Sequence, residues 1–344
     1  MTHGGNVWQG EGPGAWLDYS ANIRPEGMPE WVRQALRRGM ESAAYYPEAG
    51  MERATRAMAA YLGISPECVL PTAGGISAIE LAGRVGRETV VLTPCFCEYE
   101  QLSSRPVRKV SLLRGERRIA VPEDMRLPEE CLVWLCNPLN PVGCAFSREE
   151  VLRLLRRVED AGGWLAVDEA FIEYCPEHSV ADMVERCERL LVAGSLTKIL
   201  GIPGVRLGYL CAAPRVLEGL RKRQRTWELN CFAEAVACAL PEHREEVRSD
   251  ARENARRRER LREQLEGLGL FVYPSQAAFL LVDLGRDARP VVARLKETGI
   301  LVRECTDFDG LDDGRHLRLA VKGDENNARL IRALGEVPAC GENR

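Results

Sequence analysis

Several short apolar runs of the chain end in polar residues that can do chemistry. Three of these runs lead to Asn140, Asp168 and Lys198. Their length and the turn residues around them are typical of buried strands, and helical patterns such as that of 147–161 separate them. Strands that alternate with helices form parallel α/β sheets, whose chemistry lies at the carboxyl ends of the strands. The sequence therefore predicts an α/β fold with its site at that edge of the sheet.

Lys198 lies in the stretch SLTKILGIPGVRLGY, residues 195–209. A lysine at a strand end can lose its proton more easily than one on a solvated helix face, so Lys198 is a candidate for Schiff-base formation. The hydroxyls before it and Arg206 after it are groups that a phosphate-bearing cofactor needs. These features predict pyridoxal phosphate (PLP) as cofactor. The alternative is an ordinary surface lysine.

The same stretch resembles the lysine loop of fold-type I PLP enzymes, the class I and II aminotransferase group. Thr-Lys followed by Ile-Pro-Gly-x-Arg-x-Gly-Tyr looks most like the threonine-phosphate decarboxylases of cobalamin biosynthesis. Histidinol-phosphate aminotransferases more often carry Ser-Lys and Ala-Gly at those places. The resemblance implies a large domain with a mostly parallel seven-stranded sheet and a small α+β domain. We expect an N-terminal arm and helix over 1–45, a large PLP-binding domain over 46–229 and a small domain over 230–344.

The composition of the chain limits the classes of function that it can have. A net charge of -4 with 28% charged residues gives no nucleic-acid footprint, and the arginines of 252–262 alternate with glutamates, as on a solvated helix face. There is no apolar run of about 18 residues, so we expect no membrane span. The first residues lack a signal-peptide pattern, and we expect a cytoplasmic protein. The 13 cysteines include no Cys-x-x-Cys pair, so we expect reduced, largely buried thiols and no metal.

A Gly-Gly turn between an apolar strand and a helix start is the second candidate for cofactor binding. Helix amides and the positive end of the helix dipole attract an anion, and glycine lets a phosphate approach the backbone. An ordinary turn is the alternative. The residues that we expect around the cofactor phosphate are Gly75, Ile76, Ser77, Ser195 and Arg206.

Asp168 is the candidate partner of the cofactor ring. A carboxylate beside the ring nitrogen keeps it protonated, and the protonated ring is the electron sink; a helix cap is the alternative. By resemblance, Phe96 stacks on the ring, and Asn140 in the motif NPLNPVG donates to its phenolic oxygen. Tyr99 is expected to be packing or pocket wall. Phe171 stands where histidinol-phosphate aminotransferases usually have tyrosine, and the missing hydroxyl favours a decarboxylase.

The resemblance also implies substrate residues. The N-terminal arm, with HGGN and DYSANIRP, lies across the active site in the decarboxylase family, which brings His3 and Asn22 to the substrate; Arg24 stands where that family usually has asparagine. Arg318 corresponds to the arginine that pairs with the substrate α-carboxylate, although its alternating strand pattern also fits a side chain in solvent. Arg303 corresponds to the arginine for the substrate phosphate.

Tyr46 corresponds to a tyrosine that reaches the cofactor phosphate of a neighbouring subunit, which implies a homodimer with shared active sites. The implied reaction is decarboxylation of a small phosphorylated amino acid, L-threonine O-3-phosphate, to (R)-1-amino-2-propanol O-2-phosphate. The alternatives are histidinol-phosphate aminotransferase or a related transaminase, a decarboxylase of serine phosphate, and a PLP-fold binding protein without turnover. Which bond breaks depends on which one stands perpendicular to the cofactor ring. Sequence motifs do not show this geometry, so the prediction of decarboxylation depends on the resemblance.

Overall fold

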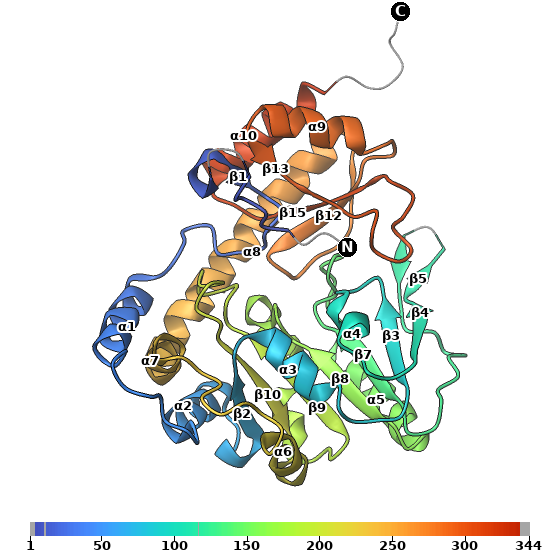
Figure 1. Cartoon of the computed structure of the whole chain (residues 1–344). Helices are drawn as coiled ribbons and strands as arrows, with labels where there is room; N and C mark the ends of the chain where they lie inside the picture. The colour runs from blue at the N-terminus through green and yellow to red at the C-terminus, as the bar shows by residue number, and fades with distance from the viewer. Residues whose placement is uncertain (1–3, 10–11, 116, 338–344) are drawn as a thin grey trace, which may run out of the picture.

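The computed structural model describes residues 4–9, 12–115 and 117–337. Its larger sheet has seven strands in the order β2-β10-β9-β8-β7-β3-β4 (Figure 1). The strands are β2 (Val69–Thr72), β3 (Thr89–Thr93), β4 (Val107–Ser111), β7 (Leu132–Cys136), β8 (Trp164–Asp168), β9 (Leu190–Ser195) and β10 (Gly208–Ala212). β10 is antiparallel to both neighbours, and the other pairs are parallel. The predicted α/β fold with a mostly parallel seven-stranded sheet is confirmed.

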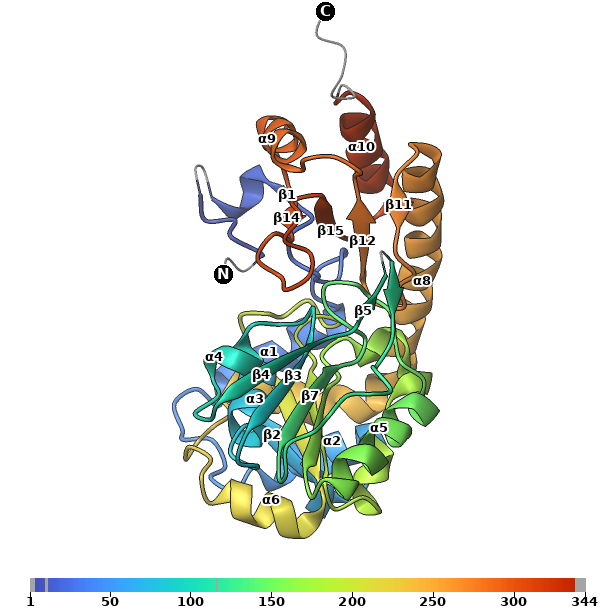
Figure 2. The same cartoon turned by 90° about the vertical axis from the view of Figure 1, so that its right-hand side faces the viewer.

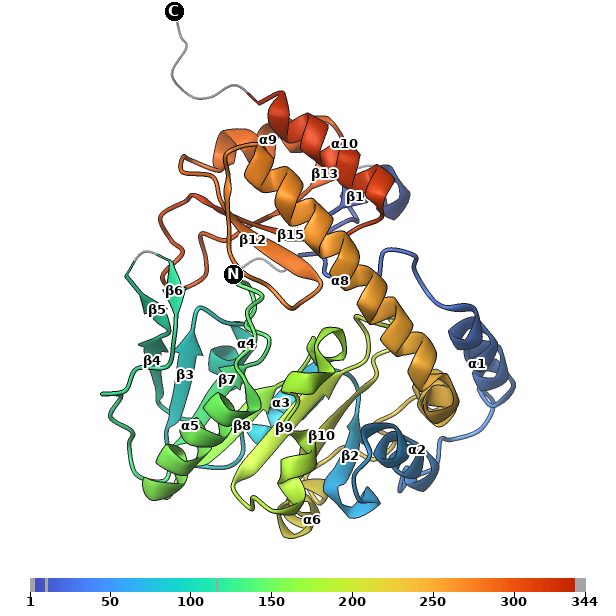
Figure 3. The same cartoon turned by 180° about the vertical axis from the view of Figure 1, so that it is seen from behind.

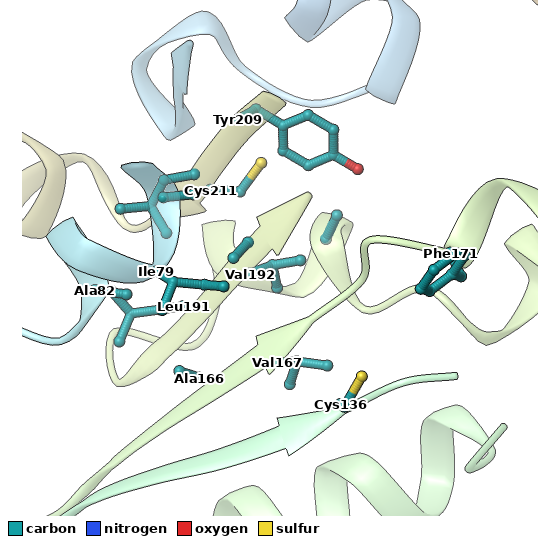
Figure 4. Close-up of a cluster of buried hydrophobic side chains, with 14 of the residues drawn as sticks. Ile79, Ala82, Cys136, Ala166, Val167, Phe171, Leu191, Val192, Tyr209 and Cys211 are labelled. Atoms are coloured by element: carbon teal, nitrogen blue, oxygen red, sulfur yellow. The ribbon is translucent and has the colours of Figure 1, made fainter. Parts of the chain in front are cut away.

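Helices cover both faces of this sheet because its central strands are buried on both sides. The helices of this part are α1 (Glu30–Glu41), α2 (Glu52–Leu62), α3 (Gly75–Ala82), α4 (Glu98–Gln101), α5 (Arg148–Asp160), α6 (Pro214–Arg221) and α7 (Cys231–Ala239). α3 lies in front of the sheet in Figure 1, and α5 lies in front in Figure 3, which shows the opposite side. Figure 4 shows Ile79 and Ala82 of α3 beside Leu191 of β9 in the apolar core.

A smaller antiparallel sheet lies above the first in Figure 1, in the order β11-β12-β15-β14. Its strands are β11 (Phe271–Val272), β12 (Phe279–Asp283), β14 (Arg303–Glu304) and β15 (His316–Ala320), with α8 (Arg244–Gly267), α9 (Arg289–Glu297) and α10 (Asp324–Gly335) around it. Within the small domain we expect a strand over 301–303, and this prediction is wrong in one respect. The chain there forms two short strands in different sheets, β13 (Ile300–Leu301) and β14, because β13 pairs with the N-terminal arm and β14 pairs with β15.

The arm is held on the smaller sheet, and Figure 2 shows it there. β1 (Leu17–Asp18) runs parallel to β13. Tyr19 is fully buried, its hydroxyl donates to Oδ1 of Asn327 at 3.0 Å, and its carbonyl accepts from the N–H of Ala320. The arm therefore runs beside β15, the strand that carries Arg318.

α8 is a 24-residue helix that passes from α7 to the smaller sheet, as Figure 3 shows. Its arginines pair with glutamates three or four residues away, such as Arg256 with Glu253 and Arg262 with Glu266, which confirms the predicted solvated face. None of the described helices is long and apolar enough to cross a membrane. The described part of the chain also holds no cluster of three or more His, Cys, Asp or Glu side chains that fits a metal ion.

The remaining elements are short. They are the hairpin β5 (Leu113–Arg114) and β6 (Arg118–Ile119) and the 3-10 turns η1 (Pro13–Ala15), η2 (Pro66–Cys68), η3 (Ile172–Tyr174), η4 (Pro176–His178), η5 (Ala181–Glu185) and η6 (Leu240–His243). The expected division of the chain at 45/46 and 229/230 stays a prediction. Buried residues of α7 belong to the same apolar cluster as the seven-stranded sheet, while Leu261 and Leu265 of α8 belong to that of the smaller sheet.

Candidate active site

The predicted cofactor and catalytic residues gather at one edge of the larger sheet. β2, β3, β7, β8 and β9 run in the same direction, so their carboxyl ends meet there, and β10 begins there. The residues at this edge are Gly75, Ile76 and Ser77 after β2, Phe96 after β3, Asn140 after β7, Asp168 at the end of β8, Ser195 and Lys198 at and after β9, and Arg206 before β10.

Gly74 and Gly75 turn the chain from β2 into α3 within contact distance of two predicted phosphate ligands. Gly74 has a φ of +81°, and a Cβ there would lie 2.5 Å from Nη2 of Arg206. A Cβ on Gly75 would lie 3.3 Å from Cβ of Ser195. Gly74 is the N-cap of α3 and no side chain caps the helix, so its first N–H groups keep no capping partner. The turn therefore presents helix amides beside a guanidinium.

Arg206 gives this turn its positive charge. Its Nη1 donates to the carbonyl of Pro203 at 3.0 Å, and it makes no ion pair with the described residues. A guanidinium without a carboxylate partner beside the positive end of a helix is an anion site. The residues present therefore fit the phosphate of PLP.

Lys198 lies in the turn after β9. Burial and then the charges of Arg206 and Arg318 lower the pKa of its amine to about 8, against the opposing charge of Asp168. The residue is partly exposed, but the protein atoms packed around its amine leave the ammonium poorly solvated. About a tenth of this amine is therefore neutral at pH 7, far more than of an ordinary lysine, as the strand-end position predicted.

Asp168 is buried at the end of β8 and is held by two donors. The Tyr99 hydroxyl donates to Oδ2 at 2.5 Å, and the N–H of Ala170 donates to Oδ1 at 2.8 Å. Burial raises the pKa of Asp168, while the bond from Tyr99 acts in the opposite direction. These contacts hold the carboxylate in place, and both bonds favour its ionised form.

Tyr99 is the site residue whose contact sequence reasoning missed. It is fully buried on α4, where its ring stacks on Trp134 at a centroid distance of 4.7 Å. Phe96 lies edge-on to it at 6.0 Å. The sequence signal was weak, because a tyrosine three residues after the predicted stacking aromatic reads as packing, and its bond to Asp168 joins residues far apart in the chain.

Arg318 is buried, so the solvent-facing alternative is excluded. Its Nη1 donates to Oδ1 of Asn140 at 2.6 Å and its Nη2 to the carbonyl of Ser20 at 2.7 Å, while Nε has no hydrogen-bond partner. Burial lowers its pKa to about 10, and it makes no ion pair with the described residues. A buried guanidinium with neutral acceptors and a free N–H is suited to a carboxylate.

Arg303 lies directly across from Arg318 on the neighbouring strand. It is buried, and its Nη2 bonds both carboxylate oxygens of Asp307, at 2.7 and 2.9 Å. Its guanidinium carbon lies 5.0 Å from the ring centre of Phe308. The two arginines predicted to bind the two acidic groups of the substrate are therefore neighbours.

The arm reaches Arg318 at Gly4. A Cβ on Gly4 would lie 2.1 Å from the carbonyl oxygen of Ser20 and 3.3 Å from Nη2 of Arg318, so only glycine fits there. His3 lies outside the described residues. Asn22 is buried with an unpartnered Oδ1, which fits a residue that awaits a ligand. Arg24 turns away, because its side chain pairs with Asp250 of α8 at 2.8 Å.

Two further predicted positions differ in exposure. Phe171 is buried and packs edge-on against Phe279, with 5.0 Å between the ring centres, and it brings no hydroxyl to this position. Tyr46 is 80% exposed and stacks on the exposed Trp227 at 4.3 Å. It therefore stands on the surface of its own chain.

Comparisons with known proteins agree with this geometry. The family model of aminotransferase class I and II matches residues 16–334. The threonine-phosphate decarboxylase of Salmonella typhimurium is 31% identical, over 98% of this chain and 96% of that protein. The L-threonine-O-3-phosphate decarboxylase from Porphyromonas gingivalis superposes with a TM-score of 0.80 at 24% identity, over 92% of this chain and 97% of that one. The histidinol-phosphate aminotransferase from Clostridium acetobutylicum gives a TM-score of 0.83 at 24% identity, also over 92% and 97%. The two structures establish the shared fold.

Proposed function

The chain belongs to the aminotransferase class I and II family, and from this premise we propose that it is a PLP-dependent decarboxylase of L-threonine O-3-phosphate. The product is (R)-1-amino-2-propanol O-2-phosphate, for cobalamin biosynthesis. The observation that carries the proposal is the buried pair Arg303 and Arg318, directly opposite on neighbouring strands. Two neighbouring cations suit a small substrate with two separate acidic groups. Threonine phosphate is such a substrate, and the near full-length similarity to a threonine-phosphate decarboxylase supports it.

PLP, when bound, supplies an electron sink for the electron pair of a bond broken at the α-carbon. The phosphate of the cofactor would be held by the turn at the start of α3, that is, by the amides of Gly75 and Ile76 and the hydroxyl of Ser77, together with Ser195 and Arg206. The missing ion-pair partner of Arg206 supports this assignment.

Asp168 would hold the proton at the ring nitrogen. Its carboxylate is buried and fixed by Tyr99 and Ala170, and an ionised carboxylate favours a protonated nitrogen beside it. Phe96 would cover one face of the ring. Asn140 would donate to the phenolic oxygen of the cofactor. Its Oδ1 accepts from Arg318, so its Nδ2, the donor of the amide, points away from Arg318.

Lys198 would move the proton at the α-carbon. An amine with a pKa of about 8 both accepts and gives a proton near neutral pH, which is what general acid–base work requires. Arg318 and Asn22 would hold the substrate carboxylate, and Arg303, with His3, would hold its phosphate. Orientation of the carboxylate selects the bond that breaks.

The second candidate is histidinol-phosphate aminotransferase. It is favoured by relatives of that name, such as the one from Moorella thermoacetica, 28% identical over 94% of this chain and 86% of that protein. Phe171 argues against it, since its place is apolar and packed against Phe279. A substrate panel separates the two. We expect turnover of threonine phosphate, less of serine phosphate, and none of unphosphorylated threonine or of histidinol phosphate with 2-oxoglutarate.

We also infer a homodimer with shared active sites. Tyr46 and Trp227 form an exposed aromatic pair, and Asn230, close to Trp227 in the chain, donates to the carbonyl of Val205 beside Arg206. A second copy would cover this pair and receive Tyr46 at its cofactor phosphate. Mixing Lys198→Ala with Tyr46→Ala subunits should then restore activity to about a quarter, since half of the dimers carry one intact site. A fully active monomer in light scattering would contradict the shared site.

The same proposal places the protein in the cytoplasm. The 12 cysteines of the described residues are free thiols. A cysteine-rich chain with unpaired thiols is suited to a reducing compartment. Fractionation of the native cells, with an antibody against the protein, would test this.

A further inference from the structure

Asp307 occupies the guanidinium of Arg303 at the place where the substrate phosphate is expected. Both of its oxygens accept from Nη2, at 2.7 and 2.9 Å. Arg303 itself has little freedom to move, because its side chain is 9% exposed and its Nη1 donates to the carbonyl of Glu304 at 2.6 Å. The side chain of Asp307 is 26% exposed, and it lies in the loop after β14. A rotation of this aspartate would remove its carboxylate from Nη2 of the arginine.

The two arginines differ in what they hold. Arg318 bonds neutral oxygens and has an unpartnered Nε, whereas Arg303 already bonds a carboxylate. No carboxylate of the described residues bonds Arg318, so a substrate carboxylate would meet only neutral acceptors at its guanidinium. A phosphate that arrives at Arg303 meets Asp307, which both occupies a donor and repels a second anion at the same place.

We propose that Asp307 takes the place of the substrate phosphate on Arg303 in the free enzyme. It leaves Arg303 only when a strongly anionic group replaces it. This inference rests on the proposed function, and it makes Asp307 a residue that sets specificity. A phosphate carries close to two negative charges at neutral pH and three acceptor oxygens, so it displaces the aspartate. A hydroxyl or a single side-chain carboxylate competes with Asp307 on equal or weaker terms and stays outside.

The test is calorimetric binding of inorganic phosphate to the holoenzyme, in which the cofactor already fills the turn at α3. Asp307→Asn removes the competing charge at nearly unchanged shape, and we expect it to bind phosphate about tenfold more tightly. We also expect a lower KM for threonine phosphate with unchanged kcat, and new binding of L-glutamate. In the double variant Arg303→Gln with Asp307→Asn the gain should disappear.

Asp309→Asn is the matched control. Asp309 lies in the same loop but pairs with Lys109, 3.1 Å away on β4, so its loss should leave phosphate affinity within twofold of the parent enzyme. Unchanged or weaker phosphate binding in Asp307→Asn would overturn the proposal, since Asp307 would then only position Arg303. Calorimetry needs no turnover, so an enzyme that releases no CO2 would refute the proposed function and still test Asp307.

A second measurement covers the case in which Asp307→Asn does not fold. A crystal structure of the parent holoenzyme soaked in threonine phosphate should show Arg303 on a phosphate oxygen, with Asp307 turned away. Asp307 still bonded to Nη2 of Arg303 beside a bound phosphate would overturn the proposal.

Discussion

Arg318 donates to Oδ1 of Asn140 at a distance of 2.6 Å. This bond joins the smaller sheet to the edge of the larger sheet where the candidate cofactor residues lie. An arginine can only donate, so this bond fixes the amide of Asn140 with its nitrogen away from Arg318. The same guanidinium also holds the arm through the carbonyl of Ser20. One buried side chain therefore aligns three parts of the chain that are distant in sequence.

Replacement of Arg318 by glutamine should lower kcat/KM by about a hundredfold or more, because loss of one partner of a buried charge pair costs at least about 2–5 kcal/mol. Arg318→Lys keeps the positive charge but cannot donate two parallel hydrogen bonds. Its kcat/KM should therefore lie between that of Arg318→Gln and that of the parent enzyme. Steady-state kinetics with threonine phosphate measure both. Equal kcat/KM for Arg318→Gln and the parent enzyme would remove Arg318 from the site.

Tyr99→Phe should shift the acid limb of the pH profile of kcat/KM upward by about one pH unit. One unit corresponds to about 1.4 kcal/mol, roughly the free energy of one hydrogen bond to a charged group. The hydroxyl of Tyr99 opposes the rise in the pKa of Asp168 that burial causes, so without it the carboxylate ionises only at higher pH. The phenyl ring keeps its stacking on Trp134. A profile that drops in height but does not move along the pH axis would mean that the bond is structural.

Lys198 should react with an acylating reagent half-maximally near pH 8 in the apoprotein, because burial and two arginines lower the pKa of its amine to about 8. Below that pH it is an unreactive ammonium. Arg206→Gln removes one of the two cations and should move the midpoint to higher pH. Mass spectrometry of the peptide that contains Lys198 gives the rate, with Lys198→Ala as blank. A midpoint near that of surface lysines would contradict the site electrostatics.

Glu169 should make the protein less stable as pH rises. Burial raises the pKa of its carboxyl from 4.5 to about 7, although Ser179 and Val180 donate to it. The folded state then holds the proton more tightly than the unfolded state, so stability is lost between about pH 4.5 and 7, by up to about 3 kcal/mol. Glu169→Gln should lack this loss in urea unfolding across that range. Parallel pH dependence in both proteins would show that Glu169 titrates normally.

Much of the site could be predicted because its residues follow strands that the sequence marks clearly. Lys198, Asp168 and Asn140 come directly after apolar runs, and parallel strands bring such positions together whatever lies between them. The glycines at 74 and 75 were predicted for the same reason, as a turn between a strand and a helix.

The missed features are contacts of side chains across long sequence distances. Tyr99 reaches Asp168, 69 residues away, and Arg24 reaches Asp250, 226 residues away. No local pattern encodes such a pairing, since it depends on how elements pack. The link from Arg303 to Asp307 is local, yet its geometry follows from a loop that the sequence does not define. The split between β13 and β14 arose because the arm supplies a strand that local patterns cannot assign.

The measurement that tests the central claim most directly is the yield of CO2 per active site from L-threonine O-3-phosphate in the presence of PLP and the absence of any keto acid. A decarboxylase returns its cofactor unchanged after each cycle, so we predict sustained release over many turnovers, with one amine product for each CO2. A transaminase stops after one half-reaction unless a keto acid is supplied. No CO2, with amino transfer that depends on 2-oxoglutarate, would contradict the account.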